Sequence, residues 1–146
     1  MKAKIAIAND HAGTELKFKV MQQFADSVDF VNFGTDATDS VDYPDFVHPL
    51  AESVEKEEVS LGVLICGSGN GVCMTANKHE KVRAGLAWTA EIAGLARQHN
   101  NANVVCIPAR FVSEETALDI VKIFLETEFE GGRHQRRVDK ISCESI

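Results

Sequence analysis

The chain has 146 residues, of which 45% are hydrophobic and 25% are charged, proportions that are ordinary for a globular protein and exclude a disordered or fibrous chain. Its formal net charge of −7 argues against a protein that binds nucleic acid through a basic surface. No apolar run approaches the roughly 20 residues that a membrane-spanning helix requires. We therefore expect a single domain over residues 1–146 of a cytoplasmic protein, with no nucleic-acid or membrane partner.

Short apolar runs predict five strands, over residues 5–8, 28–33, 61–66, 83–87 and 104–108. Helical spacing and helix-start signals predict helices between them, over residues 14–25, 44–54, 71–78, 89–99 and 113–126. A short basic helical tail is expected at about 132–146. Strands that alternate with helices over short connections predict an α/β fold, in which helices cover both faces of a parallel sheet.

Polar residues directly follow three of the predicted strands. Asp10 and His11 follow the first strand, residues 66–71 end the third strand and begin the next loop, and Arg110 follows the fifth strand. In open α/β sheets, ligands bind outside the carboxyl ends of the strands. We therefore expect these residues to contribute to a ligand site.

A cysteine and a glycine-rich turn separate the third strand from the helix after it. The spacing Gly67-x-Gly69-x-Gly71 lets backbone N–H groups approach an anion, but it is not the G-x-G-x-x-G pattern of dinucleotide sites, and a tight turn without a ligand explains it equally well. Cys66 faces the positive end of the helix, where a thiolate is favoured, although a small core residue is the ordinary alternative. The four cysteines show no C-x-x-C or zinc-finger spacing, and we expect free thiols.

Basic side chains gather toward the end of the chain. His99 falls in the last turn of a predicted helix, where it can serve as a proton donor or as a structural residue. Arg133 and Arg137 are four residues apart, so they share a helix face and can bind one phosphate; a solvated basic face is the alternative. His48 and His79 have no such neighbours in the sequence, and no role is assigned to them.

Six short motifs are spread along the chain: Asn9-Asp-His-Ala-Gly13, Asp42-Tyr-Pro-Asp45, Cys66-Gly-Ser-Gly-Asn-Gly71, Ala76-Asn-Lys78, Arg97-Gln-His-Asn100 and Glu130-Gly-Gly-Arg-His-Gln-Arg-Arg137. In this order and spacing they resemble the type B ribose-5-phosphate isomerases, over residues 4–141. The resemblance implies a Rossmann-like three-layer sandwich with a five-stranded parallel sheet. It also implies a homodimer, or a tetramer built from dimers, with active sites between subunits, a small sugar phosphate as substrate, and no metal or organic cofactor.

The resemblance also implies a role for each matching residue. Cys66 would be the base that moves a proton from C2 to C1 of the open-chain sugar through an enediolate, and Ser68 would help to move the proton between O1 and O2. His99, supported by Asp10, would open the sugar ring. Other members of the family carry a glutamate base just after the last glycine, where this chain has Val72, so Cys66 is the only candidate base in this loop. The substrate would be bound by His11, Tyr43, Gly67, Gly69, Asn70, Gly71, Asn100, Arg110, Arg133 and Arg137.

The activity so implied is the interconversion of D-ribose 5-phosphate and D-ribulose 5-phosphate. A phosphorylated hexose, allose 6-phosphate or galactose 6-phosphate, is an alternative substrate, because the wider family includes isomerases of both and shares its phosphate-binding and enediol residues. A non-catalytic α/β module that binds a nucleotide or phosphate through residues 67–71 is a second alternative. That module gives no reason for Cys66, His99 and the arginine pair to occur together.

Overall fold

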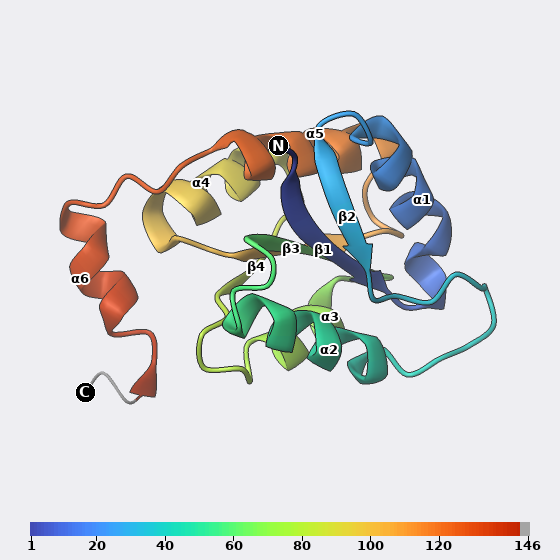
Figure 1. Ribbon diagram of the computed structural model, residues 1–146, viewed down its shortest axis with the longest axis horizontal. Coiled ribbons are helices and arrows are strands. Elements are labelled where there is room, and N and C mark those ends of the chain that lie inside the picture. Colours follow the sequence, from blue (N-terminus) through green and yellow to red (C-terminus); the bar gives the residue numbers. More distant parts are fainter. Residues whose placement is uncertain (144–146) are drawn as a thin grey trace.

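A parallel sheet forms the centre of the molecule (Figure 1). The computed structural model describes residues 1–143. Within these residues the strands form a five-stranded sheet in the order β2-β1-β3-β5-β4, and every neighbouring pair is parallel, as predicted. The strands are β1 (Ala3–Asn9), β2 (Val28–Asn32), β3 (Leu61–Cys66), β4 (Ala84–Leu86) and β5 (Val104–Pro108).

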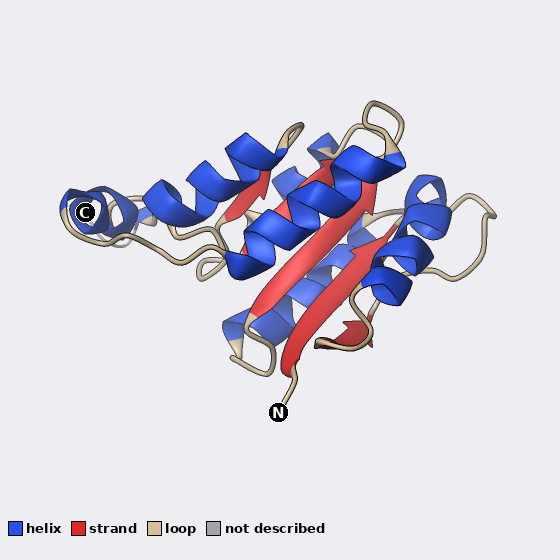
Figure 2. Cartoon of the chain, turned by 90° about the horizontal axis from the view of Figure 1, so that it is seen from above, coloured by secondary structure: helices blue, strands red, loops and turns tan. Residues whose placement is uncertain are grey.

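Helices cover both faces of the sheet and complete three layers. One face carries α1 (Thr14–Gln23), α4 (Ala90–Asn100) and α5 (Glu114–Glu126), and the other carries α2 (Pro44–Glu55) and α3 (Asn70–Ala76), as Figure 1 shows. The basic tail forms α6 (Arg133–Asp139), which stands away from the sheet beyond the end of α4 (Figure 2). Residues 144–146 of the predicted tail lie outside the described residues. Over the described part of the chain, no helix is long and apolar enough to cross a membrane.

The strands are almost wholly apolar because both faces of the sheet are covered. Successive side chains of a strand point to opposite faces, so the sheet takes part in two cores. The core against α1 and α5 takes Ile5, Ile7, Val63, Ile65, Val105 and Ile107 from the strands. The core against α2 and α3 takes Ala6, Ala8, Leu64, Cys66, Val104 and Cys106. This alternation decides that Cys66 lies on the α2–α3 side of the sheet.

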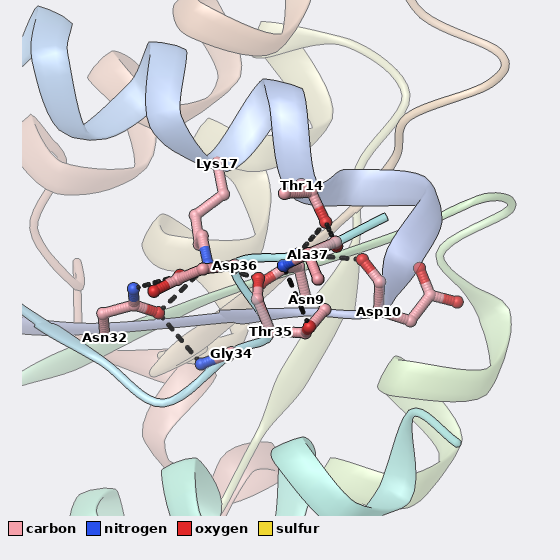
Figure 3. Close-up of polar contacts among 9 residues, drawn as sticks. All are labelled: Asn9, Asp10, Thr14, Lys17, Asn32, Gly34, Thr35, Asp36 and Ala37. Atoms are coloured by element: carbon pink, nitrogen blue, oxygen red, sulfur yellow. Dashed lines mark hydrogen bonds and ion pairs between the residues drawn. The ribbon is translucent and has the colours of Figure 1, made fainter. Parts of the chain in front are cut away.

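A fully buried lysine attaches the loop after β2 to α1 (Figure 3). Lys17 Nζ donates hydrogen bonds to Thr35 O at 2.5 Å, to Asp36 Oδ1 at 2.5 Å and to Asn32 Oδ1 at 3.3 Å. Three acceptors compensate for the water that the ammonium group loses on burial. Apolar spacing predicted α1 correctly, but it gave no sign that Lys17, one of two lysines in this helix, is buried.

The same loop is also attached to the end of β1. Asn9 Nδ2 donates to Thr14 Oγ1 at 3.1 Å, and Thr14 Oγ1 in turn donates to Ala37 O at 2.7 Å (Figure 3). The loop continues to Tyr43 and α2. These contacts therefore hold the approach to α2 beside the carboxyl end of β1.

Acid should weaken this attachment. Hydrogen bonds from Lys17 and then Asn32 lower the pKa of the Asp36 carboxyl in the folded protein. A carboxyl with a lowered folded pKa stabilises the protein above its unfolded pKa of about 4, and this contribution is lost as the pH falls through the folded value. We expect the free energy of unfolding, measured with urea, to fall as the pH drops below about 4, and to fall less in Asp36→Asn.

Lys17→Met provides the matched variant, because it removes the donor and keeps an unbranched side chain that is only one atom shorter. It should lower the free energy of unfolding at neutral pH by about 1–3 kcal/mol, since the buried Thr35 carbonyl loses a charged donor. It should also reduce the acid sensitivity that Asp36 contributes. An acid profile identical to that of the unaltered protein in both variants would contradict the role assigned to this ion pair.

Candidate active site

Three loops meet at the carboxyl ends of the central strands. Hydrogen bonds continue past the strand ends: Asp10 N donates to Ile65 O at 3.2 Å, and Ala109 N donates to Cys66 O at 2.8 Å. Arg110 N donates to Gly67 O at 3.0 Å. The structure thus brings together the polar residues that follow β1, β3 and β5, as the strand-end argument predicted.

The sulfur of Cys66 lies inside the turn that follows β3. Cys66 is buried, and Gly69 N donates a hydrogen bond to its Sγ at 3.2 Å. Gly69 has a φ of +78° and is the residue before α3, while Asn70 N donates to Ser68 Oγ at 3.3 Å. An N–H group directed at sulfur stabilises negative charge there. One of the N–H groups of the glycine turn, which was predicted to let backbone N–H groups approach an anion, therefore bonds to the Cys66 sulfur.

Two side chains lie against the backbone of this turn. A β-carbon at Gly71 would stand 2.7 Å from Tyr43 Cε1, and one at Gly67 would stand 3.3 Å from Arg110 Nη1. The absence of side chains at these glycines allows Tyr43 and Arg110 to approach the Cys66 loop. Both residues were predicted to bind the substrate, and the structure places both beside the glycine turn.

Asp10 and His11 form the other wall of the site. Asp10 Oδ1 accepts a hydrogen bond from Ala12 N at 2.9 Å and caps a short 3-10 turn, His11–Gly13, which was not predicted. His11 Nδ1 accepts from Val41 N at 3.2 Å, so a neutral His11 ring carries its proton on Nε2. An open cavity of about 550 Å³ is lined by Asp10, His11 and residues 41–45.

The remaining predicted site residues, His99, Asn100, Arg133 and Arg137, lie away from the strand ends, at the end of α4 and on α6. His99 is near the carboxyl end of α4, about 14 Å along the helix axis from Ala90. Because α4 runs back from the strand ends toward α6, His99 and Asn100 are carried away from Cys66 (Figure 1). The predicted support of His99 by Asp10 therefore does not occur within one chain.

His99 lies instead beside the last helix. Its ring stacks on that of His134 with centroids 4.3 Å apart, and Glu130 N donates to Gln98 O at 3.1 Å. On α6, Arg137 Nη1 donates to Arg133 O at 3.2 Å, and both guanidinium groups are exposed. One chain thus holds two groups of candidate residues, one at the strand ends and one between α4 and α6.

The structure also gives neighbours to the two histidines that had no assigned role. His48 Nδ1 lies 2.7 Å from His79 Nε2, and His79 Nδ1 lies 2.8 Å from Glu55 Oε1. The hydrogen bond with His79 lowers the pKa of the Glu55 carboxyl. The three residues come from α2 and the loop after α3, so their separation in sequence concealed the contact.

The other cysteines lie in different surroundings. All four cysteines fall within the described residues and are free thiols, as predicted. Complete burial raises the pKa of the Cys106 thiol, whereas a hydrogen bond with Cys106 lowers that of Cys73. Cys143 is exposed near the end of the chain. Among the four, Cys66 is the one enclosed by the glycine turn at the strand ends.

Comparison with known proteins points to one family. Residues 5–141 match the family described as Ribose/Galactose Isomerase. The chain is 48% identical to a probable ribose-5-phosphate isomerase B of Mycoplasma genitalium, over 97% of this chain and 95% of that protein. It is 39% identical to ribose-5-phosphate isomerase B of Escherichia coli strain K12, over 96% and 95% of the two chains.

Solved structures agree with the sequence comparison. A ribose 5-phosphate isomerase from Thermotoga maritima superposes with a TM-score of 0.94 at 43% identity, covering 97% of this chain and 99% of that one. Ribose-5-phosphate isomerase B from Mycoplasma genitalium, solved with bound ribulose-5-phosphate, gives a TM-score of 0.92 at 46% identity, over 97% and 95% of the chains.

The packing around the turn after β3 makes a testable prediction about stability. Alanine at Gly69 must adopt a left-handed φ, and its β-carbon would stand 2.5 Å from Leu86 Cδ1. We expect Gly69→Ala to lower the free energy of unfolding in urea by about 2–4 kcal/mol. Gly131 has a φ of +66° with no described atom within 4 Å of such a carbon, so Gly131→Ala should cost only about 1 kcal/mol. Equal losses in the two variants would contradict the close packing.

Proposed function

Since the chain belongs to the ribose/galactose isomerase family, we propose that it interconverts D-ribose 5-phosphate and D-ribulose 5-phosphate with Cys66 as the base. The relatives named above support the substrate, because they are called ribose-5-phosphate isomerases and match nearly the whole chain. The observation that carries the proposal is the geometry of Cys66, whose sulfur accepts a hydrogen bond from Gly69 N at the end of a central strand. The alternative base position is occupied by Val72, which is apolar and fully buried.

The proposed reaction moves one proton at carbon and one at oxygen. The Cys66 thiolate removes the proton from C2 of the open-chain aldose, which leaves an enediolate with its charge on O1, and then returns that proton to C1. Ser68 carries the hydroxyl proton from O2 to O1, so that the carbonyl group ends at C2. No external oxidant is needed, because the electron pair of the C2–H bond becomes part of the new C1–H bond.

The N–H groups of the glycine turn can stabilise the negative charge of this reaction, which is first on the Cys66 sulfur and then on a substrate oxygen. While sulfur is negative, Gly69 N–H stabilises it. When sulfur has taken the proton, the negative charge is on the substrate oxygen, and N–H groups of residues 67–71 can donate hydrogen bonds to that oxygen. Donors that are already oriented stabilise charge without the cost of reorganising water. The turn therefore serves the thiolate and the enediolate in succession.

Ring opening and phosphate binding require the second group of residues, the group between α4 and α6. We infer that a partner subunit supplies His99 to open the sugar ring and Arg133 and Arg137 to hold the phosphate together with His11 and Arg110. Two features of the chain favour a second copy. Trp88 and Phe111 form an exposed aromatic pair with ring centroids 5.4 Å apart, and α6 stands out from the body as an arm (Figure 2). Exposed apolar clusters of this kind mark surfaces that associate.

Removal of the thiol tests the proposed base. We expect Cys66→Ala to lower kcat for formation of ribulose 5-phosphate by about 10²–10⁴-fold or more, while the Kd of the sugar phosphate changes only a few-fold. The assay contains excess EDTA, because the proposed reaction uses no metal. Cys143→Ala removes an exposed thiol outside the site and should leave kcat unchanged. Normal kcat in Cys66→Ala would exclude the cysteine base.

The same assay distinguishes the substrates. The ratio kcat/KM should be higher for ribose 5-phosphate than for allose 6-phosphate or galactose 6-phosphate. If the folded protein turned over only a hexose phosphate, the proposed chemistry would stand and the proposed substrate would be wrong.

Mixing two inactive variants tests whether the site is shared between subunits. If Cys66 and His99 of one site come from different chains, a hybrid dimer of Cys66→Ala and His99→Ala contains one intact site and one that lacks both groups. Equal amounts, unfolded and refolded together, should regain about one quarter of the original activity, because half of the dimers are hybrids. If each chain builds its own site, the mixture stays inactive.

A further inference from the structure

Two imidazoles and a carboxylate converge where α4 ends. His99 Nε2 lies 3.9 Å from Glu130 Oε1, and His134 Nε2 lies 3.5 Å from the same oxygen. The three ligand atoms lie within 4.8 Å of one another. In a tetrahedral zinc site with bonds of about 2.1 Å, neighbouring ligand atoms are about 3.4 Å apart. Side-chain movements of about an ångström would therefore bring the three atoms to coordination distance.

The backbone holds the three residues in this arrangement. Glu130 N donates to Gln98 O at 3.1 Å, which fixes the carboxylate beside the end of α4. Glu130 and His134 are four residues apart, and the His99 and His134 rings are nearly parallel, with 14° between their planes. The backbone therefore keeps the three side chains close together, and the two rings must rotate out of their stack for both nitrogens to face one ion.

We propose that His99, Glu130 and His134 form a binding site for a divalent cation of the Zn²⁺ type, and that this cation inhibits the enzyme. Two imidazoles and one carboxylate are a ligand set that Zn²⁺ accepts, whereas Mg²⁺ and Ca²⁺ prefer oxygen ligands alone. Three protein ligands leave the fourth position of a tetrahedral site to water. In the single chain, the side chains of His99 and Glu130 are 41% and 52% exposed, so water reaches the fourth position from the side that these residues leave open.

Nearby arginines oppose a cation, but only weakly. Arg133 and Arg137 lie on the same helix as His134, and their guanidinium groups are exposed. The high dielectric constant of water weakens the repulsion between exposed charges, and salt weakens it further at separations beyond about 8 Å. Glu130 supplies a negative charge that touches the ion directly. Attraction by Glu130 together with repulsion by the arginines favours a cation that binds reversibly rather than a permanent structural one.

Inhibition rests on the proposed function, because it follows from the use of His99. A nitrogen that coordinates a metal cannot pass a proton to or from the ring oxygen of the sugar. The cation and the sugar phosphate therefore compete for His99. Since ring opening precedes isomerisation, occupation of the site slows turnover without any change at Cys66.

Binding is tested first, without reference to turnover. A Cys143→Ser background removes an exposed thiol that can also bind zinc. Calorimetric titration with Zn²⁺ should then give one ion per chain, and both His134→Ala and Glu130→Gln should weaken binding at least tenfold. His48→Ala is the matched control, because it removes a histidine from the other histidine cluster, and should leave the affinity unchanged. Unchanged affinity in His134→Ala, or its loss in His48→Ala, would overturn the site.

Turnover is tested second. Zn²⁺ should lower the rate on ribose 5-phosphate over the concentration range in which it binds, and EDTA should restore the rate. In Glu130→Gln, the Zn²⁺ concentration that halves the variant's own rate should rise at least tenfold. Bound Zn²⁺ with undiminished turnover would overturn the inhibition. Absence of turnover before any Zn²⁺ is added would contradict the proposed isomerase and leave the binding result standing.

Discussion

Pairing of the three central strands is the constraint on which the site depends. β3 lies between β1 and β5, and the hydrogen bonds between these strands continue into the loops after them. The N–H groups of Asp10 and Ala109 donate to carbonyl groups at the end of β3, and Arg110 N donates to Gly67 O directly after it. Three loops that are distant in sequence are therefore held in one register. Because these hydrogen bonds join backbone atoms, they position the loops independently of the side chains that the loops carry.

Buried polar contacts extend this order to the loop before α2. The Lys17 ammonium group has no exposed surface, so it must keep its acceptors, and those acceptors belong to residues 32–36. Thr14 binds the same loop from the end of β1 through Ala37 O. The chain then enters α2 close to the glycine turn, where Tyr43 lies against Gly71. An apolar residue in place of Lys17 would bury surface equally well, but it would not specify where this loop lies.

The length and direction of α4 divide the candidate residues into two groups. A helix that follows a strand in an α/β sheet runs back along the sheet, so its last residues lie far from the strand ends. His99 and Asn100 are carried in this way to α6 and its arginines. This arrangement gives each chain two incomplete sets of residues, which is the physical basis for proposing that a second copy completes the site. It also leaves His99 beside Glu130 and His134, where a cation can bind.

Most of the fold could be predicted from local sequence, because apolar periodicity and glycine positions report which residues are buried and where the chain turns. The sheet, its two covered faces and the cluster of Asp10, Cys66 and Arg110 followed from that pattern and from the rule that parallel strands end at one edge. The burial of Lys17, the separation of His99 from Asp10 and the meeting of His99 with His134 did not follow. Each of these features depends on contacts between segments that are far apart in the chain. The free energy of those contacts depends on how the helices pack on the sheet, and no local pattern in the sequence encodes that packing.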